Sequence, residues 1–250
     1  MIDQEQLATF VLRLADDAMV LGQRLAEWTS NGPTLEEDIA NSNIALDYLG
    51  RARMLYAYAG ELTGKTEDDL AFLRGAREYS NLLMHELPKG DYAFTMTRQY
   101  FIDCFDLLYF QNLAASSDQR LASIAAKTVK ECAYHLRRSE DMMLRLGSGT
   151  EESNQRMQTA LNELWGYRHE LFLQDELESG LVKAGVAVDR EALLETWRQQ
   201  VLACIAEATL SVPEKDWQVV GGRAGVHSEH LGHMLDDMQC LRRSHPGAQW

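Results

Sequence analysis

Proline is scarce in this chain of 250 residues: it occurs four times, at Pro33, Pro88, Pro213 and Pro246. Residues 89–212 therefore contain none. Proline lacks a backbone N–H and breaks helices, so a proline-free stretch of this length that is rich in Ala, Leu, Glu, Gln and Arg is typical of long helices. No segment shows the alternation of apolar and polar residues that marks a strand. The chain is predicted to be all-α.

Positive charge is also in short supply, with 24 Lys and Arg against 38 Asp and Glu, a formal net charge of −14. Nucleic-acid binding depends on Lys and Arg that neutralise phosphates, so this balance argues against it, and against polybasic attachment to a membrane. No apolar run approaches the roughly 18 residues that a membrane span needs. The amino-terminal residues lack the basic and apolar regions of a secretory signal.

Cysteine pairs are missing as well. The four cysteines, Cys104, Cys132, Cys204 and Cys240, lie far apart, and no two have the CxxC spacing. This pattern is neither a disulfide framework nor a zinc site. We expect four reduced, mostly buried thiols in a cytoplasmic protein.

The sequence does contain helical periodicity along nearly its whole length. Thr34 with Glu37 has the spacing of a capping box, and so does Ser148 with Glu151. Residues 147–149 (Gly-Ser-Gly) are expected to form a glycine C-cap. The expected helices cover approximately residues 7–25, 35 to 60–64, a short stretch from 66, 92–113, 118–146, 151–172, 189–210 and a final stretch ending near 243.

Residues 79–91 are expected to form an irregular connection, and the glycine-rich residues 221–225 a turn into the last helix. The helix at residues 92–113 is apolar almost all round and should be buried on most sides. We predict one domain over residues 1–250: a bundle of four long antiparallel helices with three or four more packed outside.

A bundle of this kind often holds a dinuclear carboxylate metal centre, with one Glu from each of two helices and Glu-x-x-His from each of the other two. The spacing places carboxylate and imidazole on one face of a helix, one turn apart. None of the seven histidines has an acid three residues before it. The residues at that position are Leu82, Cys132, Gly166, Ala224, His227, His230 and Arg242. The chain therefore lacks the usual di-iron motif.

Acids nevertheless interrupt the apolar faces of the expected helices. One hypothesis is a degenerate metal site, with Gly50 where a ligating histidine would be wanted one turn after Asp47. Its candidate residues are Asp47, Gly50, Asp103, Asp106, Glu131 and His135. The alternative is structural ion pairing, because an isolated buried carboxylate is very costly. The candidate partners are Arg51, Arg53, Arg98 and Arg137.

We favour ion pairing, and predict it for Asp47, Asp103, Asp106 and Glu131 with nearby Arg or His residues. No catalytic, cofactor-binding or metal-ligating residue is expected in this chain. The only histidine cluster, His227, His230 and His233, is spread over about 120 degrees of a helix by its three-residue spacing. Hydrogen bonds at a surface or an interface are expected for it.

Several segments together resemble the C-subunit family of the bacterial ring 1,2-phenylacetyl-CoA epoxidases, the PaaC family. The most specific is Gly-Gly-Arg at residues 221–223, followed by His-Ser-Glu-His-Leu-Gly at 227–232. The matching segments extend over essentially the whole chain, and their order and spacing together make the resemblance specific. The other matching segments are residues 43–53, 98–103, 130–131, 134–137, 145–147, 149–150, 207–210, 212–213, 246–247 and 250.

This resemblance implies a ferritin-like four-helix bundle core with additional packed helices, which does not itself bind iron. It implies a homologous catalytic subunit that carries the di-iron centre, within a hetero-oligomer that uses O2 and NADPH-derived electrons from a reductase to epoxidise the ring of phenylacetyl-CoA. The chain would be a structural subunit without its own cofactor. We expect part of the partner surface in residues 221–250, whose histidines and Trp250 have no evident core role.

Two other readings compete with this one. The first is an active di-iron or other metal carboxylate oxidoreductase with atypical ligands, drawn from Asp16 and the degenerate-site acids and His135. The second is an unrelated helical binding or scaffold protein that has no oxygenase partner.

Overall fold

A computed structural model describes residues 3–248, which form ten α-helices, four short 3-10 helices and no strand. The all-α prediction is confirmed. The described chain divides into two compact units: one comprises the residues up to Pro88 and from Gly221 onward, and the other comprises Lys89–Val220. The expectation of a single domain stays a prediction.

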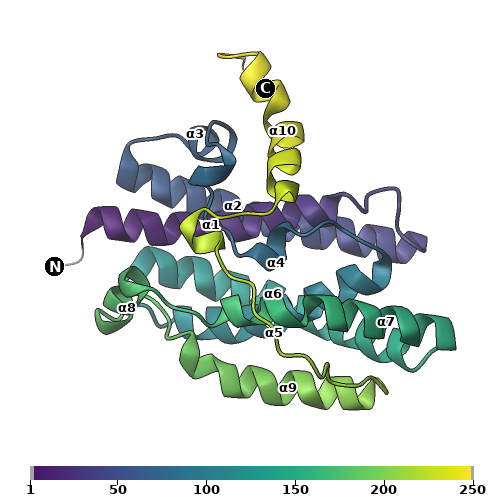
Figure 1. The fold of residues 1–250 in the computed structure, drawn as a ribbon. Helices are drawn as coiled ribbons and strands as arrows, with labels where there is room; N and C mark the ends of the chain where they lie inside the picture. Colours follow the sequence, from purple (N-terminus) through teal and green to yellow (C-terminus); the bar gives the residue numbers. More distant parts are fainter. Residues whose placement is uncertain (1–2, 249–250) are drawn as a thin grey trace. The chain divides into compact units, whose positions relative to one another are not determined.

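In the first unit, α1 (Gln4–Ala26) and α2 (Leu35–Thr63) are long helices that lie side by side (Figure 1). The Thr34 side chain accepts a hydrogen bond from the Glu37 N–H and caps α2 at its start. Gly64, with φ of 73°, ends it in the left-handed conformation that glycine adopts readily. The expected bounds of this helix are therefore confirmed.

Three shorter helices complete the first unit: α3 (Glu67–Phe72), α4 (Leu83–Glu86) and α10 (Glu229–Ser244), with 3-10 turns η1 (Ala76–Glu78) and η4 (Gly222–Ala224). The apolar side of α10 buries Leu231, Met234 and Leu235 against Val20 and Tyr79. Because α10 covers part of α1 and η1, the carboxyl-terminal segment is part of the core of this unit. The connection at residues 79–91, expected to be irregular, contains α4.

The second unit is built on α5 (Tyr92–Leu113) and α6 (Gln119–Gly147), which pack together. Asp91 and Asp118 cap their starts by accepting backbone N–H groups. Phe101 of α5 makes edge-to-face contacts with Trp165 and Trp197. The prediction that α5 is buried on most sides is confirmed.

The rest of the second unit differs from the expected pattern. Its helices are α7 (Glu151–Leu164), η2 (Trp165–Leu171), α8 (Glu176–Lys183), η3 (Glu191–Leu193) and α9 (Leu194–Glu207). The cap of α7 is Thr150, which exchanges hydrogen bonds with Ser153, so the predicted Ser148–Glu151 box is wrong. Neither Gly147 nor Gly149 has a positive φ, so the predicted glycine C-cap of α6 is also wrong.

After Leu164 the chain tightens into a 3-10 helix instead of continuing as an α-helix to residue 172. A Cβ on Gly166 would lie 2.2 Å from a ring carbon of Trp217, so only glycine allows this indole to rest on the η2 backbone. The helix α8 was not among the expected helices, because Gly180 in its interior lowers the helix propensity of this stretch.

Candidate functional site

Asp103 is the most deeply placed candidate acid of the second unit, with no exposed surface. Its carboxylate accepts hydrogen bonds from Gln99 Nε2, at 2.6 Å, and from Ser139 Oγ, at 2.7 Å. Burial raises the pKa of Asp103 to about 6, although the charge of His135 and the two hydrogen bonds act to lower it. Side chains of α5 and α6 thus meet this acid from both helices.

The other candidates of the second unit gather around the same pair of helices. His135 is fully buried and Asp106 is 7% exposed, and the charge of Asp106 acts to raise the pKa of Asp103. Glu131 is half-buried, one turn before His135 on α6. The structure therefore brings Asp103, Asp106 and His135 close together. Within residues 3–248, however, no three His, Cys, Asp or Glu side chains are arranged to hold a metal ion.

Asp47 and Gly50 belong to the first unit, on α2. Asp47 is half-buried. Gly50 is exposed, and no atom lies within 4 Å of the place that a Cβ would take. A histidine at this position would extend into open space, so Gly50 does not line an interior site as the spacing suggested.

The arginines proposed as partners for the interior acids have varied roles. Arg53 is exposed and its Nε lies 3.2 Å from Glu67 Oε1, so it pairs with a surface acid. Arg51 is buried, with its guanidinium 4.4 Å from the ring centre of Tyr48. Arg137 lies over the ring of Tyr134 at 5.7 Å. Arg98 is buried, with its guanidinium 6.0 Å from the ring centre of Phe94. Three of these four cations thus contact aromatic rings, a role that the sequence pattern did not suggest.

Asp16 of α1, one of the possible ligands under the metalloenzyme reading, is the centre of a buried polar cluster in the first unit. Its carboxylate forms an ion pair with Arg74, whose Nη1 lies 3.1 Å from Oδ2. It also accepts hydrogen bonds from Tyr56 Oη at 2.7 Å and from the Ser80 N–H at 3.0 Å and hydroxyl at 3.2 Å. Four donors around one carboxylate make Asp16 a structural acid.

Asp17, the next residue of α1, holds the carboxyl-terminal segment. Its Oδ2 lies 2.6 Å from Arg223 Nη2, and Oδ1 accepts the Leu82 N–H at 2.8 Å. Burial acts to raise the pKa of Asp17, but the charges of Arg223 and His85 and the hydrogen bonds from Arg223 and Leu82 together lower it overall. Arg223 also donates to the Ser80 carbonyl oxygen at 2.6 Å. This guanidinium therefore joins η4 to α1.

Glu86, at the end of α4, holds the same segment a few residues further on. Its carboxylate lies 2.6 Å from His227 Nδ1 and accepts hydrogen bonds from Asn81 Nδ2 at 2.9 Å and the Ser228 N–H at 2.6 Å. His227 therefore has an interior role, and its assignment to a surface or partner contact is wrong. His230 is half-buried, His233 is exposed, and Trp250 lies outside the described residues.

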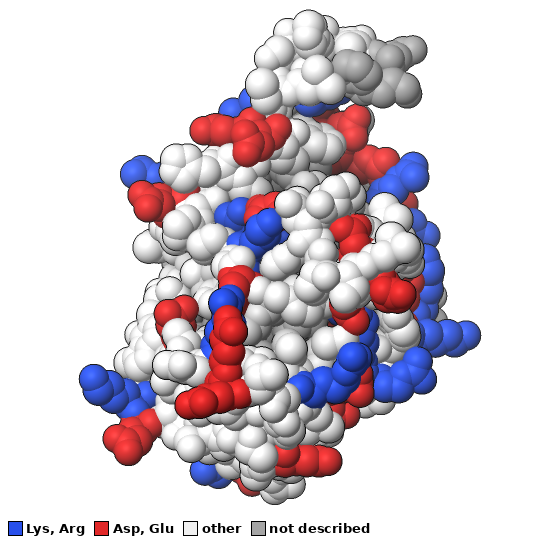
Figure 2. All heavy atoms as spheres, turned by 90° about the vertical axis from the view of Figure 1, so that its right-hand side faces the viewer, with Lys and Arg blue, Asp and Glu red and all other residues white. Residues whose placement is uncertain are grey.

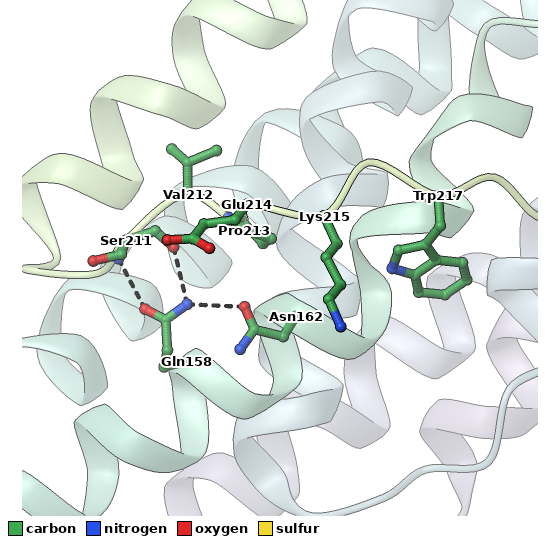
Figure 3. A pocket seen from close by; sticks show the side chains of 8 residues that line it. All are labelled: Gln158, Asn162, Ser211, Val212, Pro213, Glu214, Lys215 and Trp217. Carbon is green, nitrogen blue, oxygen red and sulfur yellow. Dashed lines mark hydrogen bonds between the residues drawn. The ribbon is translucent and has the colours of Figure 1, made fainter.

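A surface groove of the second unit has a volume of about 530 Å³. It lies between α7 and residues 211–217 (Figure 3). Its polar side chains bond within the groove: Gln158 accepts the Ser211 N–H at 2.8 Å and donates to the Ser211 carbonyl at 2.9 Å and to Asn162 Oδ1 at 3.2 Å. The two bonds to Ser211 fix this residue to α7.

Surface charge and hydropathy add two observations. Acidic and basic side chains are interspersed over the face seen in Figure 2. None of the helices described is long and apolar enough to cross a membrane.

Cys104, Cys132 and Cys204 are buried free thiols and Cys240 is exposed, which confirms the prediction of mostly buried, unpaired cysteines for this part of the chain.

Long helices without strands in residues 3–248, and interior acids held by the chain's own donors, define a helical-bundle protein. The family model described as "Phenylacetic acid catabolic protein" matches residues 2–250, and the chain belongs to this family, which is ferritin-like. The chain is 49% identical over 246 residues to the C subunit of 1,2-phenylacetyl-CoA epoxidase from Escherichia coli (strain K12), covering 98% of this chain and 99% of that relative. The resemblance predicted from the motifs is confirmed.

Proposed function

We propose that this chain is the non-catalytic structural subunit of a multicomponent di-iron oxygenase that epoxidises the ring of phenylacetyl-CoA. The similarity to the C subunit of an epoxidase extends over almost the full length of both chains, which supports the same place in a complex. Under this proposal the di-iron centre resides in a homologous catalytic subunit, and a reductase delivers the electrons.

The observation that carries the non-catalytic role is the way this chain uses its interior acids. Asp16 is neutralised by Arg74, and Asp103 is hydrogen-bonded by Gln99 and Ser139. A di-iron carboxylate site needs several carboxylates and two imidazoles turned toward one point. In the described part of the chain, no group of three such donors converges. Under this proposal the interior acids stabilise the helices and the metal is held by the partner.

The proposed assembly is a hetero-oligomer in the cytoplasm. The free thiols Cys104, Cys132, Cys204 and Cys240 suit a reducing compartment. The rigid polar clusters around Asp16 and Glu86 would keep this subunit's helices in a constant arrangement, which is what a catalytic partner needs from a supporting surface.

Metal analysis together with reconstitution tests this proposal. We would measure iron per chain in this protein alone, in the catalytic subunit alone and in their purified complex, and then phenylacetyl-CoA-dependent NADPH oxidation with the reductase. We expect about two irons per catalytic subunit and none held tightly by this chain. About two tightly held irons on the isolated chain would instead support the metalloenzyme reading. Failure to associate with any di-iron subunit would support the scaffold reading.

A further inference from the structure

The outward side of α2 exposes large apolar side chains. Leu35 is 72% exposed, Ile39 52% and Leu46 64%. Single exposed apolar residues are ordinary on a protein surface. Three of them on one side of one helix, within twelve residues, form an apolar patch of the kind that marks an interaction site.

The spacing of the residues in this patch indicates what kind of surface would pack against it. Leu35, Ile39, Ser42, Leu46 and Leu49 follow one another in alternating steps of four and three residues. An average step of 3.5 residues is the seam by which one α-helix packs along another, with side chains of each helix inserted between those of its partner. The complementary surface is therefore a long helix, and we call these five positions the α2 seam.

Two neighbouring features favour close contact along this line. Leu49, the last position of the seam, is half-buried and its Cδ2 is 3.1 Å from the place that a Cβ of Gly22 in α1 would take, so the seam ends at the edge of the α1–α2 pair. Gly50 is exposed and has open space around it. The absence of a side chain there lets another backbone approach α2 closely.

We propose that the α2 seam is the surface on which a long helix of the homologous catalytic subunit packs. This inference rests on the proposed function, because it takes the catalytic subunit as the partner. The acids Glu36 and Asp38 flank the seam at the positions that face a partner's flanking residues in helix pairs. The matching helix therefore carries Lys or Arg beside its apolar line.

Charge also favours the catalytic subunit over a second copy of this chain as the partner. Each copy has a formal net charge of −14, so pairing of two copies brings strong like charge together. A helix with basic flanks gains attraction at the same positions. Electrostatic complementarity of this kind chiefly increases the association rate and the choice of partner.

The test compares the binding of full-length variants to the purified catalytic subunit, with the dissociation constant measured by sedimentation or surface binding. The variant Ile39→Glu/Leu46→Glu places two charges in the seam at exposed positions. Circular dichroism and thermal unfolding establish that it remains folded. Leu194→Glu, at a 41% exposed leucine of α9, is the matched control.

We expect the double variant to raise the dissociation constant about 100-fold or more, as loss of central interface contacts does. Leu194→Glu should change it less than about threefold, and Glu36→Lys should weaken binding several-fold at low salt and less at high salt. Equal binding by the wild-type chain and the double variant would overturn the assignment of the seam while leaving the proposed function in place. Absence of binding by the wild-type chain would overturn both. Self-association that the double variant abolishes would make a second copy the occupant and would overturn this proposal.

Discussion

The imidazole of His227 lies between two hydrogen-bond acceptors: Nδ1 is 2.6 Å from Glu86 Oε2, and Nε2 is 2.8 Å from the carbonyl oxygen of Tyr79. Both ring nitrogens must carry a hydrogen to bond both acceptors, so the site favours the imidazolium. Burial acts to lower the pKa of His227, but the hydrogen bonds to Glu86 and Tyr79 and the charges of Glu86 and Asp16 raise it above 6.5 overall.

The first prediction concerns pH. Because the folded-state pKa of His227 is raised above the unfolded value, its stabilising contribution is complete below about pH 6.5 and is lost as the pH rises through the folded pKa. As the pH rises from about 6.5 through the raised pKa of His227, the free energy of unfolding should therefore fall in the wild-type chain. His227→Gln should be less stable at the acidic end of this range and should show a smaller fall, as measured by urea denaturation.

His233→Gln is the control, since His233 is exposed on α10, the helix that follows His227. It should follow the wild-type pH profile. A His227→Gln variant with the full wild-type pH dependence would contradict the assignment of a charged His227.

The second prediction concerns the ion pair of Asp16 and Arg74, whose side chains are 0% and 9% exposed. Asp16→Asn leaves the Arg74 charge buried without its counter-charge. Removing one partner of a buried pair typically lowers the free energy of unfolding by about 3–5 kcal/mol. Urea denaturation at neutral pH measures this loss.

Arg156→Ala provides the comparison, because it removes an ion pair with Glu152 in which both side chains are more than half exposed. Its denaturation midpoint should equal that of the wild type. If Asp16→Asn were equally harmless, the cluster around Asp16 would not stabilise the first unit.

The third prediction uses the pKa of Asp103, which burial raises to about 6. A carboxyl whose folded pKa is raised above its unfolded value of about 3.9 penalises the folded state once it ionises. Its ionisation therefore reduces the free energy of unfolding as the pH rises from about 4 to 6. Asp103→Asn should remove this part of the pH dependence in denaturation measured between about pH 4.5 and pH 7.

Ser139→Ala supplies an independent check, because the Ser139 hydroxyl donates to Asp103 and acts to lower its pKa. Loss of this donor should move the pH-dependent fall in stability to higher pH. An Asp103→Asn variant with an unaltered profile would show that another group titrates in this range.

The fourth prediction concerns the close contact of Gly222 with the chain near α4. A Cβ at Gly222 would lie 2.0 Å from the carbonyl oxygen of Asn81, a contact that requires the backbone to move. Gly222→Ala should therefore lower the free energy of unfolding by about 1–3 kcal/mol, the usual range for overpacking. Limited proteolysis should cleave the segment after residue 220 faster in this variant.

Gly232→Ala is the matched substitution on the same segment. Gly232 lies within α10 and has no atom within 4 Å of the Cβ position. Alanine favours a helix over glycine by up to about 1 kcal/mol, so this variant should be as stable as the wild type or slightly more stable. A matching loss in both variants would contradict the role given to the Gly222–Asn81 contact.

Local signals predicted the long helices well. The bounds of α5 agree with the expected 92–113, and α2 and α6 agree to within one or two residues, because Thr34 and Asp118 cap helices through contacts with the next few residues. The start of α7 at residue 151 also agrees, but its cap was assigned to Ser148, because Ser148 and Thr150 are equally good capping residues by type. The helix α8 was missed because its Gly180 lowers local helix propensity, while burial of Leu181 and the ion pair of Glu178 with Arg190 compensate.

For the candidate site, the local sequence predicted less and the tertiary structure decided more. The absence of Glu-x-x-His is a property of residues three positions apart, so it could be established without any tertiary structure. The partners of the interior acids could not be predicted in this way, because Arg74 is 58 residues from Asp16 and His227 is 141 residues from Glu86. Nothing in the local pattern relates such residues.

Helix periodicity, capping residues and ligand spacing act over a few residues, which is why the chain's composition and order alone determined an all-α protein that lacks the di-iron motif. Only the packing of distant segments decided which cation pairs with each acid. The same packing made His227 an interior group and left Gly50 facing open space. Buried charges must find partners wherever packing places them, and packing is a property of the whole fold.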